Sequence, residues 1–140
     1  MEQPVQVDSF AVTHTDHRAL TLEVGGTNKS SKPSTLPQSA VVIDAAKLPN
    51  PYTPLNSKAL DLSAPKIIDW MEHKNPNTNA NMQAMIDRAK SAFSSRRSVR
   101  VQCYGGAHRS QALAWKILES MDNLTIADVQ VVCLDCEPLP

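Results

Sequence analysis

The feature that most constrains the fold is a strand, a glycine-rich turn and a helix start in direct succession. Residues 98–103 alternate between apolar and polar side chains, which predicts a half-buried strand with Arg100 and Gln102 facing outward. Apolar residues then recur at helical spacing over residues 109–121. The short connection contains the pair Gly105-Gly106, so the chain can turn sharply there. This succession predicts an α/β fold.

The remaining segments extend that prediction to an α/β sandwich of one domain over residues 1–140, with a mixed sheet. We expect the strand–loop–helix–strand unit at the end of the chain to be a right-handed parallel crossover. Composition shifts to Gly, Ser, Thr, Asn, Lys and Pro over residues 25–39, which predicts a flexible loop. The other predicted elements are strands at 5–12, 40–44 and 127–134, a helix at 63–73 capped by Ser63, and a second helix capped by Asn79 or Asn81 and continuing through Phe93.

Composition sets limits on the class of protein. The 140 residues are 41% apolar, and no apolar run is long enough for a membrane span. The N-terminal residues lack the pattern of a secretory signal, and three cysteines, an odd number, argue against a disulfide framework. We therefore expect a cytoplasmic protein without a membrane partner, and the sequence leaves homo-oligomerisation open.

The segment Cys103–Ser110 has the properties of a phosphate-binding loop. The first backbone N–H groups of a helix lack partners within it, and the helix dipole favours negative charge there. Arg109 can add a bidentate pair to phosphate oxygens, Ser110 offers a hydroxyl, and His108 can exchange a proton near neutral pH. The Gly-Lys-Ser/Thr ending of a Walker loop is missing. The alternative is a plain glycine turn with Arg109 in solvent.

Basic residues cluster just before this loop. Arg96, Arg97 and Arg100 lie in a stretch from Arg88 to Arg109 that holds no acidic residue, although the formal net charge of the chain is zero. Such a cluster is either a solvated surface or a patch that steers RNA or another anion. No cofactor or metal is expected, because Cys133-x-x-Cys136 ends a predicted strand and is better interpreted as two free thiols.

The loop resembles the Cys-x5-Arg-Ser/Thr segment of cysteine-dependent phosphatases. In that family a thiolate attacks phosphorus while the arginine holds the oxygens, roles that Cys103 and Arg109 would take. The histidine that usually precedes the nucleophile is Gln102 here, and only Asp44 and Asp61 are candidates for a general acid. A phosphatase is therefore the alternative function.

The chain resembles the C-terminal domain family of the RNase adapter protein RapZ more extensively. Three ordered segments carry this resemblance: Ser9-Phe10-Ala11-Val12-Thr13-His14, the run from Val42 to Leu48-Pro49-Asn50-Pro51, and Cys103-Tyr104-Gly105-Gly106-Ala107-His108-Arg109-Ser110. The resemblance implies an α/β domain that senses an amino-sugar phosphate and helps to bind small RNA. It also implies a pocket formed by His14, Tyr104, Gly105, Gly106, His108, Arg109 and Ser110, with Asn50 in a nearby turn. We count Ala107 with the phosphate-binding residues of the loop, and Asp44 and Asn50 with the pocket.

Two departures from this family bear on function. The nucleotide-binding domain that precedes the family's C-terminal domain is absent from these 140 residues, and the basic stretch of its last strand is replaced by residues 132–136. Asp44, at the end of a predicted strand, either hydrogen-bonds the loop or only caps a turn. We therefore predict a regulatory domain that binds a phosphorylated small molecule, with RNA as a second partner. A phosphatase is the alternative hypothesis, and an interaction domain with a vestigial pocket is the third.

Overall fold

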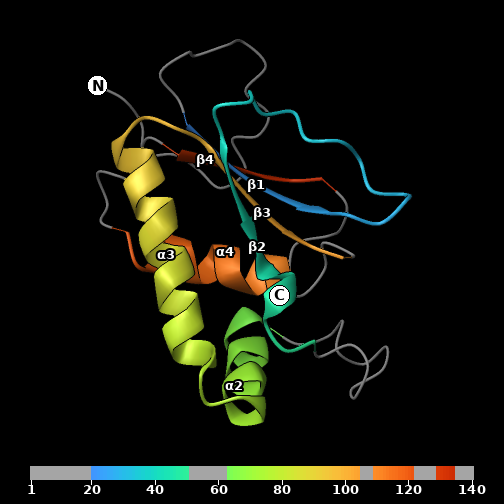
Figure 1. Cartoon of the computed structure of the whole chain (residues 1–140), viewed down its shortest axis with the longest axis vertical. Coiled ribbons are helices and arrows are strands. Elements are labelled where there is room, and N and C mark those ends of the chain that lie inside the picture. Colours follow the sequence, from blue (N-terminus) through green and yellow to red (C-terminus); the bar gives the residue numbers. More distant parts are fainter. Residues whose placement is uncertain (1–19, 51–62, 105–108, 122–128, 135–140) are drawn as a thin grey trace.

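The computed structural model describes residues 20–50, 63–104, 109–121 and 129–134. In this part of the chain four strands form one sheet, and three α-helices lie together on one side of it (Figure 1). The order across the sheet is β2-β3-β1-β4. The strands are β1 (Leu20–Gly26), β2 (Val41–Asp44), β3 (Val99–Cys103) and β4 (Val129–Cys133).

The helices begin and end close to where the sequence predicts them, with one exception. They are α2 (Ala64–Lys74), α3 (Thr78–Ser94) and α4 (Arg109–Glu119), and a 3-10 turn, η2 (Ala45–Lys47), follows β2. The predicted cap of α3 at Asn79 or Asn81 is wrong, because Asn77 occupies that position. Thr78 is buried and its hydroxyl donates to the Met71 carbonyl of α2, which fixes the earlier start. No helix in the described ranges is long and apolar enough to cross a membrane.

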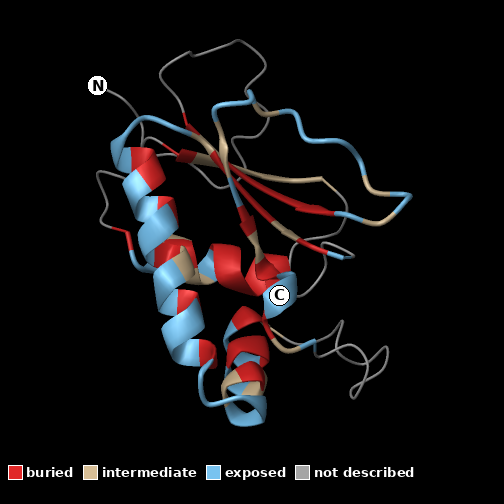
Figure 2. Ribbon diagram, viewed as in Figure 1, coloured by how far each residue is buried: buried red, intermediate tan, exposed pale blue. Residues whose placement is uncertain are grey.

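The core lies between the sheet and the helices. Alternate strand residues such as Leu22, Val24 and Val101 point into it, as the period of a strand requires. One face of α3 is apolar and is buried at Met82, Ile86, Ala89 and Phe93. Figure 2 shows the buried side of each helix turned inward and the exposed side outward. The chain is therefore an α/β domain in its described part, as predicted.

The prediction of a mixed sheet is wrong for the described strands. β1 pairs in parallel with both β3 and β4, and β2 pairs in parallel with β3. Each connection between consecutive strands is a long crossover, whereas antiparallel neighbours need only a tight hairpin. Residue alternation shows that a segment is a strand but does not give its direction relative to its neighbours.

One strand of the sheet was not predicted from the sequence. β1 is a central strand, and its last two residues, Gly25 and Gly26, were assigned to the loop 25–39. Burial explains the error: Glu23 is buried in the middle of the strand, although a charged residue within an apolar run argues against a central strand. The predicted strand at 5–12 lies outside the described residues.

Candidate functional site

The candidate site lies where β1 and β3 end side by side. In the parallel register Gly26 is opposite Cys103, the last residue of each strand. The Thr27 N–H donates to the carbonyls of Cys103 at 3.1 Å and Tyr104 at 3.0 Å, and the Asn28 N–H donates to Tyr104 at 3.1 Å. The backbone after β1 therefore holds the first residue of the glycine-rich loop. Gly105, Gly106, Ala107, His108 and the predicted pocket residue His14 lie outside the described residues.

The connections that leave these two strands run on opposite faces of the sheet. After β1, Ser34 and Thr35 hydrogen-bond Glu23, whose neighbours Leu22 and Val24 point into the core, so this connection covers the face away from the helices (Figure 1). After β3, the chain enters α4, which packs on the helical face. Adjacent parallel strands whose connections diverge in this way leave a crevice at their carboxyl ends.

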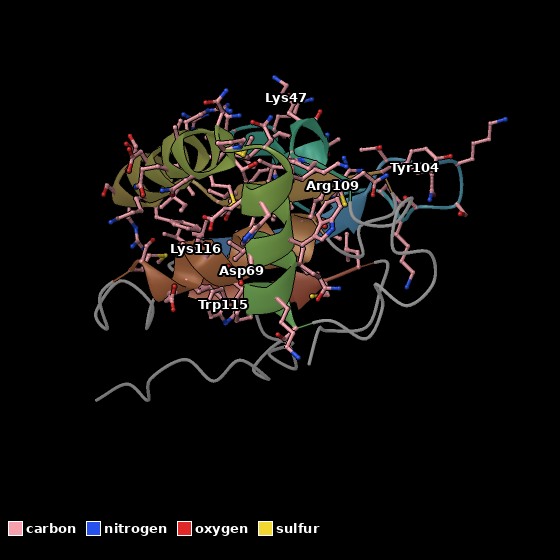
Figure 3. All side chains as sticks on the ribbon, turned by 90° about the horizontal axis from the view of Figure 1, so that it is seen from below. Lys47, Asp69, Tyr104, Arg109, Trp115 and Lys116 are labelled. Atoms are coloured by element: carbon pink, nitrogen blue, oxygen red, sulfur yellow. The ribbon has the colours of Figure 1, made fainter. Side chains whose placement is uncertain are left out.

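Arg109 is the first residue of α4 and is buried, so the alternative of a solvated arginine is wrong. Its Nη1 donates to the Ala46 carbonyl at 2.7 Å and to the Leu48 carbonyl at 3.2 Å. In Figure 3 Arg109 lies within the fold, whereas Tyr104 extends from its rim and is 66% exposed. The guanidinium therefore joins the start of α4 to the turn that follows β2, a role that sequence spacing did not indicate.

Cys103, at the end of β3, and Ser110, in the first turn of α4, are in contact. The thiol of Cys103 is 3.3 Å from the Ser110 hydroxyl and donates to it, and both residues are buried, Cys103 with only 3% of its surface exposed. A nucleophilic thiol must reach the phosphorus atom of its substrate. The arrangement therefore brings together the cysteine and serine of the Cys-x5-Arg-Ser segment but covers the sulfur.

Asp44 and Asn50, the other predicted pocket residues, both lie near the turn after β2. The Asp44 carboxylate accepts from the Ala46 N–H at 3.0 Å and caps η2, so of its two predicted roles the structure shows the cap. Asn50 is exposed and lines a shallow pocket of about 400 Å³ together with Lys47, Trp70 and Lys74.

Sequence reasoning missed a buried ion pair behind the site. Arg100 of β3 faces Glu23 of β1, and its Nη1 lies 2.7 Å from Oε1, with 8% and 0% of the two side chains exposed. Arg100 also donates to the Gln102 side chain and to the Gly26 carbonyl. The pair thus ties β3 to the end of β1, one residue before Thr27. A signal was available, since Glu23 alternates with Leu22 and Val24 as a residue on the opposite face of a strand does.

The Glu23 carboxylate is held ionised by its neighbours. Burial by itself raises the pKa of Glu23, but hydrogen bonds from Ser34, Thr35 and Arg100 outweigh burial and leave the pKa below its ordinary value. Ser34 Oγ donates at 2.6 Å, while the Thr35 N–H and hydroxyl donate at 2.9 and 2.8 Å. The loop after β1 is therefore fastened to the sheet through one acidic residue.

The three arginines predicted to steer RNA or another anion, Arg96, Arg97 and Arg100, differ in their exposure to solvent. Arg96 and Arg97 are exposed at the end of α3, but Arg100 is buried against Glu23, so the prediction that it faces solvent is wrong. An ion pair neutralises the charge that steering requires. Only two of the three predicted arginines therefore present charge to solvent.

The thiol of Cys133, one of the pair in the Cys-x-x-Cys segment, is partly buried in β4. Burial raises its pKa, which disfavours the reactive thiolate. Cys136 lies outside the described residues. Within the described ranges no group of three histidine, cysteine or acidic side chains could hold a metal ion.

Comparison with known proteins gives one match. The model of the family described as RapZ C-terminal domain matches residues 29–136, which is 108 of the 140 residues. A search of curated proteins finds no match. The matched span begins after β1 and includes the turn after β2, the glycine-rich loop and α4. His14 precedes it, so its assignment to the pocket rests only on the resemblance seen in the sequence.

Proposed function

Because the chain belongs to the RapZ C-terminal domain family, we propose that it is a regulatory or adapter domain that binds a phosphorylated ligand at the carboxyl ends of β1 and β3. The observation that carries this proposal is the divergence of the two connections. In open α/β sheets, ligands occupy the crevice outside the carboxyl ends of strands at such a switch point. The segment Cys103–Ser110 begins at the carboxyl end of β3, where the Thr27 N–H donates to Cys103 and Tyr104, and its last two residues begin α4.

The start of α4 supplies the attraction for an anion. Its first backbone N–H groups have no carbonyl partner within the helix, and its first turn carries no acidic residue. Both hydrogen bonds recorded for Arg109 to described residues use Nη1. Its Nε and Nη2 would then be the atoms that contact phosphate oxygens, with the Nη1 contacts fixing the plane of the guanidinium.

Binding is favoured over hydrolysis by the position of the thiol. Cys103 is almost wholly buried and hydrogen-bonded to Ser110, so the sulfur could attack phosphorus only after it became exposed and that bond broke. Of the two predicted general acids, Asp44 caps η2 with its carboxylate, and Asp61 lies outside the described residues. A cysteine phosphatase remains the second candidate, carried by the spacing of Cys103 and Arg109.

Three kinds of phosphate ligand fit the proposal: a phosphosugar, a nucleotide and RNA. A phosphosugar is the first choice, because the family resemblance implies an amino-sugar phosphate and the formal net charge of zero provides no general attraction to nucleic acid. RNA is the less favoured partner, since one of the three arginines predicted to steer it is neutralised by Glu23.

Ligand-induced thermal stabilisation tests the proposal. A hexosamine phosphate should raise the melting temperature of the full chain, while the same hexosamine without phosphate should not. Arg109→Lys should lose the shift, because lysine keeps the charge but lacks the planar fork. Lys116→Gln is the matched control: it removes an exposed cation from the same helix, at some distance from its start, and should retain the shift.

Two results would count against binding as the function. No stabilisation by any phosphosugar, nucleotide or inorganic phosphate would remove the proposal. Steady turnover of an aryl phosphate that disappears in Cys103→Ser would establish the phosphatase in its place.

A further inference from the structure

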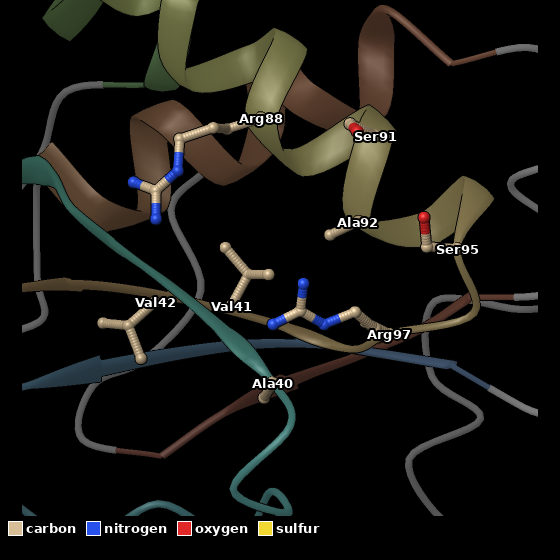
Figure 4. Close-up of a pocket in the computed structure, with 8 residues that line it drawn as sticks. All are labelled: Ala40, Val41, Val42, Arg88, Ser91, Ala92, Ser95 and Arg97. Atoms are coloured by element: carbon tan, nitrogen blue, oxygen red, sulfur yellow. The ribbon is translucent and has the colours of Figure 1, made fainter.

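A second concave site lies between α3 and the strand β2, away from the glycine-rich loop. It is a groove of about 440 Å³, within the size range of sites for small molecules. Arg88, Ser91 and Ala92 of α3 and its C-cap residue Ser95 line one wall, at the spacing of a single helical face. Val41 lies on the opposite wall, and Arg97 enters from the chain that follows α3 (Figure 4).

Two guanidinium groups extend into this groove from different parts of the chain. Figure 4 shows Arg88 reaching from α3 and Arg97 from the other side, with Val41 between them in this view. Arg97 Nε donates to the Ser39 carbonyl at 2.8 Å, which fixes the side chain and leaves its terminal nitrogens for the groove. No carboxylate in the described ranges pairs with either arginine, and none of the described lining residues is acidic.

The end of a helix normally repels anions, because its last carbonyls carry partial negative charge. At the end of α3 these carbonyls already accept hydrogen bonds from the backbone. The Arg96 N–H donates to Phe93 and the Arg97 N–H donates to Ala92, the two bonds of a Schellman motif. Arg96 adopts a positive φ of 59° in this motif. The chain therefore reverses direction at Arg96, and the next residue, Arg97, lines the groove.

We propose that this groove is a second anion site, independent of the glycine-rich loop, which binds the phosphate or carboxylate groups of a small molecule. Arg88 and Arg97 hold the oxygens in charge-assisted hydrogen bonds, the Ser91 and Ser95 hydroxyls add neutral ones, and Val41 and Ala92 contact the apolar part of the ligand. The volume exceeds that needed for a single phosphate ion, so the ligand carries either two anionic groups or one group with an organic body.

The test is a titration of the ¹⁵N-labelled 140-residue chain, observed by two-dimensional NMR at constant ionic strength. Pyrophosphate provides the phosphate chemistry and citrate the carboxylate chemistry. Saturable shifts of the Val42, Ser91 and Ser95 amides by either probe support the site, and the probe that saturates identifies the chemistry. The Ser110 amide reports the loop separately, so failure of one site is distinguishable from failure of the other.

Arg88→Gln should weaken the affinity at the groove about tenfold, as loss of a hydrogen bond to a charged group implies. Arg97→Lys should also weaken it while preserving the charge. Arg96→Gly is the matched control: it removes a neighbouring positive charge outside the groove and should leave the affinity unchanged. The spectrum of each variant shows directly whether it is folded.

Three outcomes would overturn the proposal. One is a linear response of these amides without saturation by either probe, and another is equal affinity in Arg88→Gln and the unmodified chain. The third is saturation only by a single-stranded RNA oligonucleotide, which would make the groove a surface for a nucleic-acid strand instead.

Discussion

Glu23 and Arg100 occupy opposite positions on neighbouring strands, and Arg100 Nη1 lies 2.7 Å from Glu23 Oε1. Neither side chain is appreciably exposed. Removing two charges from water is costly, and their attraction compensates only where hydrogen bonds satisfy the remaining polar atoms. Here Ser34, Thr35, Gln102 and the Gly26 carbonyl provide them. The pair therefore organises the sheet end on which the candidate site is built.

Arg100→Met should destabilise the domain by about 3–5 kcal/mol, because it leaves the Glu23 carboxylate buried without its cation. Urea unfolding at neutral pH measures the change. Lys116→Met provides the matched control, since Lys116 pairs with Glu119 on the surface and should contribute less than about 1 kcal/mol.

The double variant Glu23→Gln/Arg100→Met separates the charge from the packing. It should recover part of the loss seen in Arg100→Met, because an uncharged amide is less costly to bury. Strict additivity of the two single changes would show that the residues do not interact energetically.

Gly25→Ala should destabilise by about 1–3 kcal/mol, the usual effect of inserting a methyl group into a filled space. A Cβ on Gly25 would lie 2.7 Å from both Nη1 and Nη2 of Arg100. Thermal unfolding measures this effect. In the Arg100→Met background the same change should cost much less, since the flexible methionine can give way; an undiminished cost would point to the backbone of Gly25 instead.

Stability should fall at acid pH through Glu23. Its pKa is lowered in the folded state, so its contribution is fully present above the ordinary value of 4.5 and is lost as the pH falls through the lower folded value. Unfolding free energies measured from pH 7 downward should decline below pH 4.5 more steeply for the unmodified chain than for Glu23→Gln. Parallel curves would mean that other carboxylates determine the acid sensitivity.

Arg96→Gly should stabilise the domain by about 0.5–1 kcal/mol, because glycine adopts the left-handed conformation without the steric cost that a side chain adds. The melting temperature measures the gain. Arg96→Ala keeps the unfavourable conformation, so it should give no increase. A rise in both variants would attribute the effect to the lost charge.

Local periodicity was sufficient to predict α2, α4, β2, β3 and β4. It failed at β1 because Glu23 interrupts an apolar run, and the partners that make burial of that carboxylate acceptable are Ser34 and Thr35 in the following loop and Arg100 on another strand, 77 residues away. The direction and order of the strands depend on which distant segments pair. The spacing of apolar residues within one strand does not indicate which strand will be its neighbour.

In the candidate site, too, local features could be predicted from the sequence and contacts between distant segments could not. Arg109 and Ser110 were identifiable as the start of a helix after a strand, since this pattern is local, whereas the glycine pair lies outside the described residues. The backbone bonds from Thr27 and Asn28, and the carbonyls that Arg109 contacts, come from segments that are remote in sequence. Side-chain chemistry could not identify them, because in each case the main chain forms part of the contact.

The contact of Arg109 with the carbonyls of Ala46 and Leu48 couples ligand binding by this guanidinium to the conformation of the turn after β2. A ligand held by Nε and Nη2, as proposed, would keep the guanidinium in the plane in which Nη1 bonds these carbonyls, and would thereby stabilise the turn after β2. By reciprocity, a macromolecule that clamps this turn in its present shape changes affinity for the ligand by the same factor that the ligand changes affinity for the macromolecule. One side chain thus provides the shortest route by which a small molecule at the loop could be sensed on the surface around Asn50.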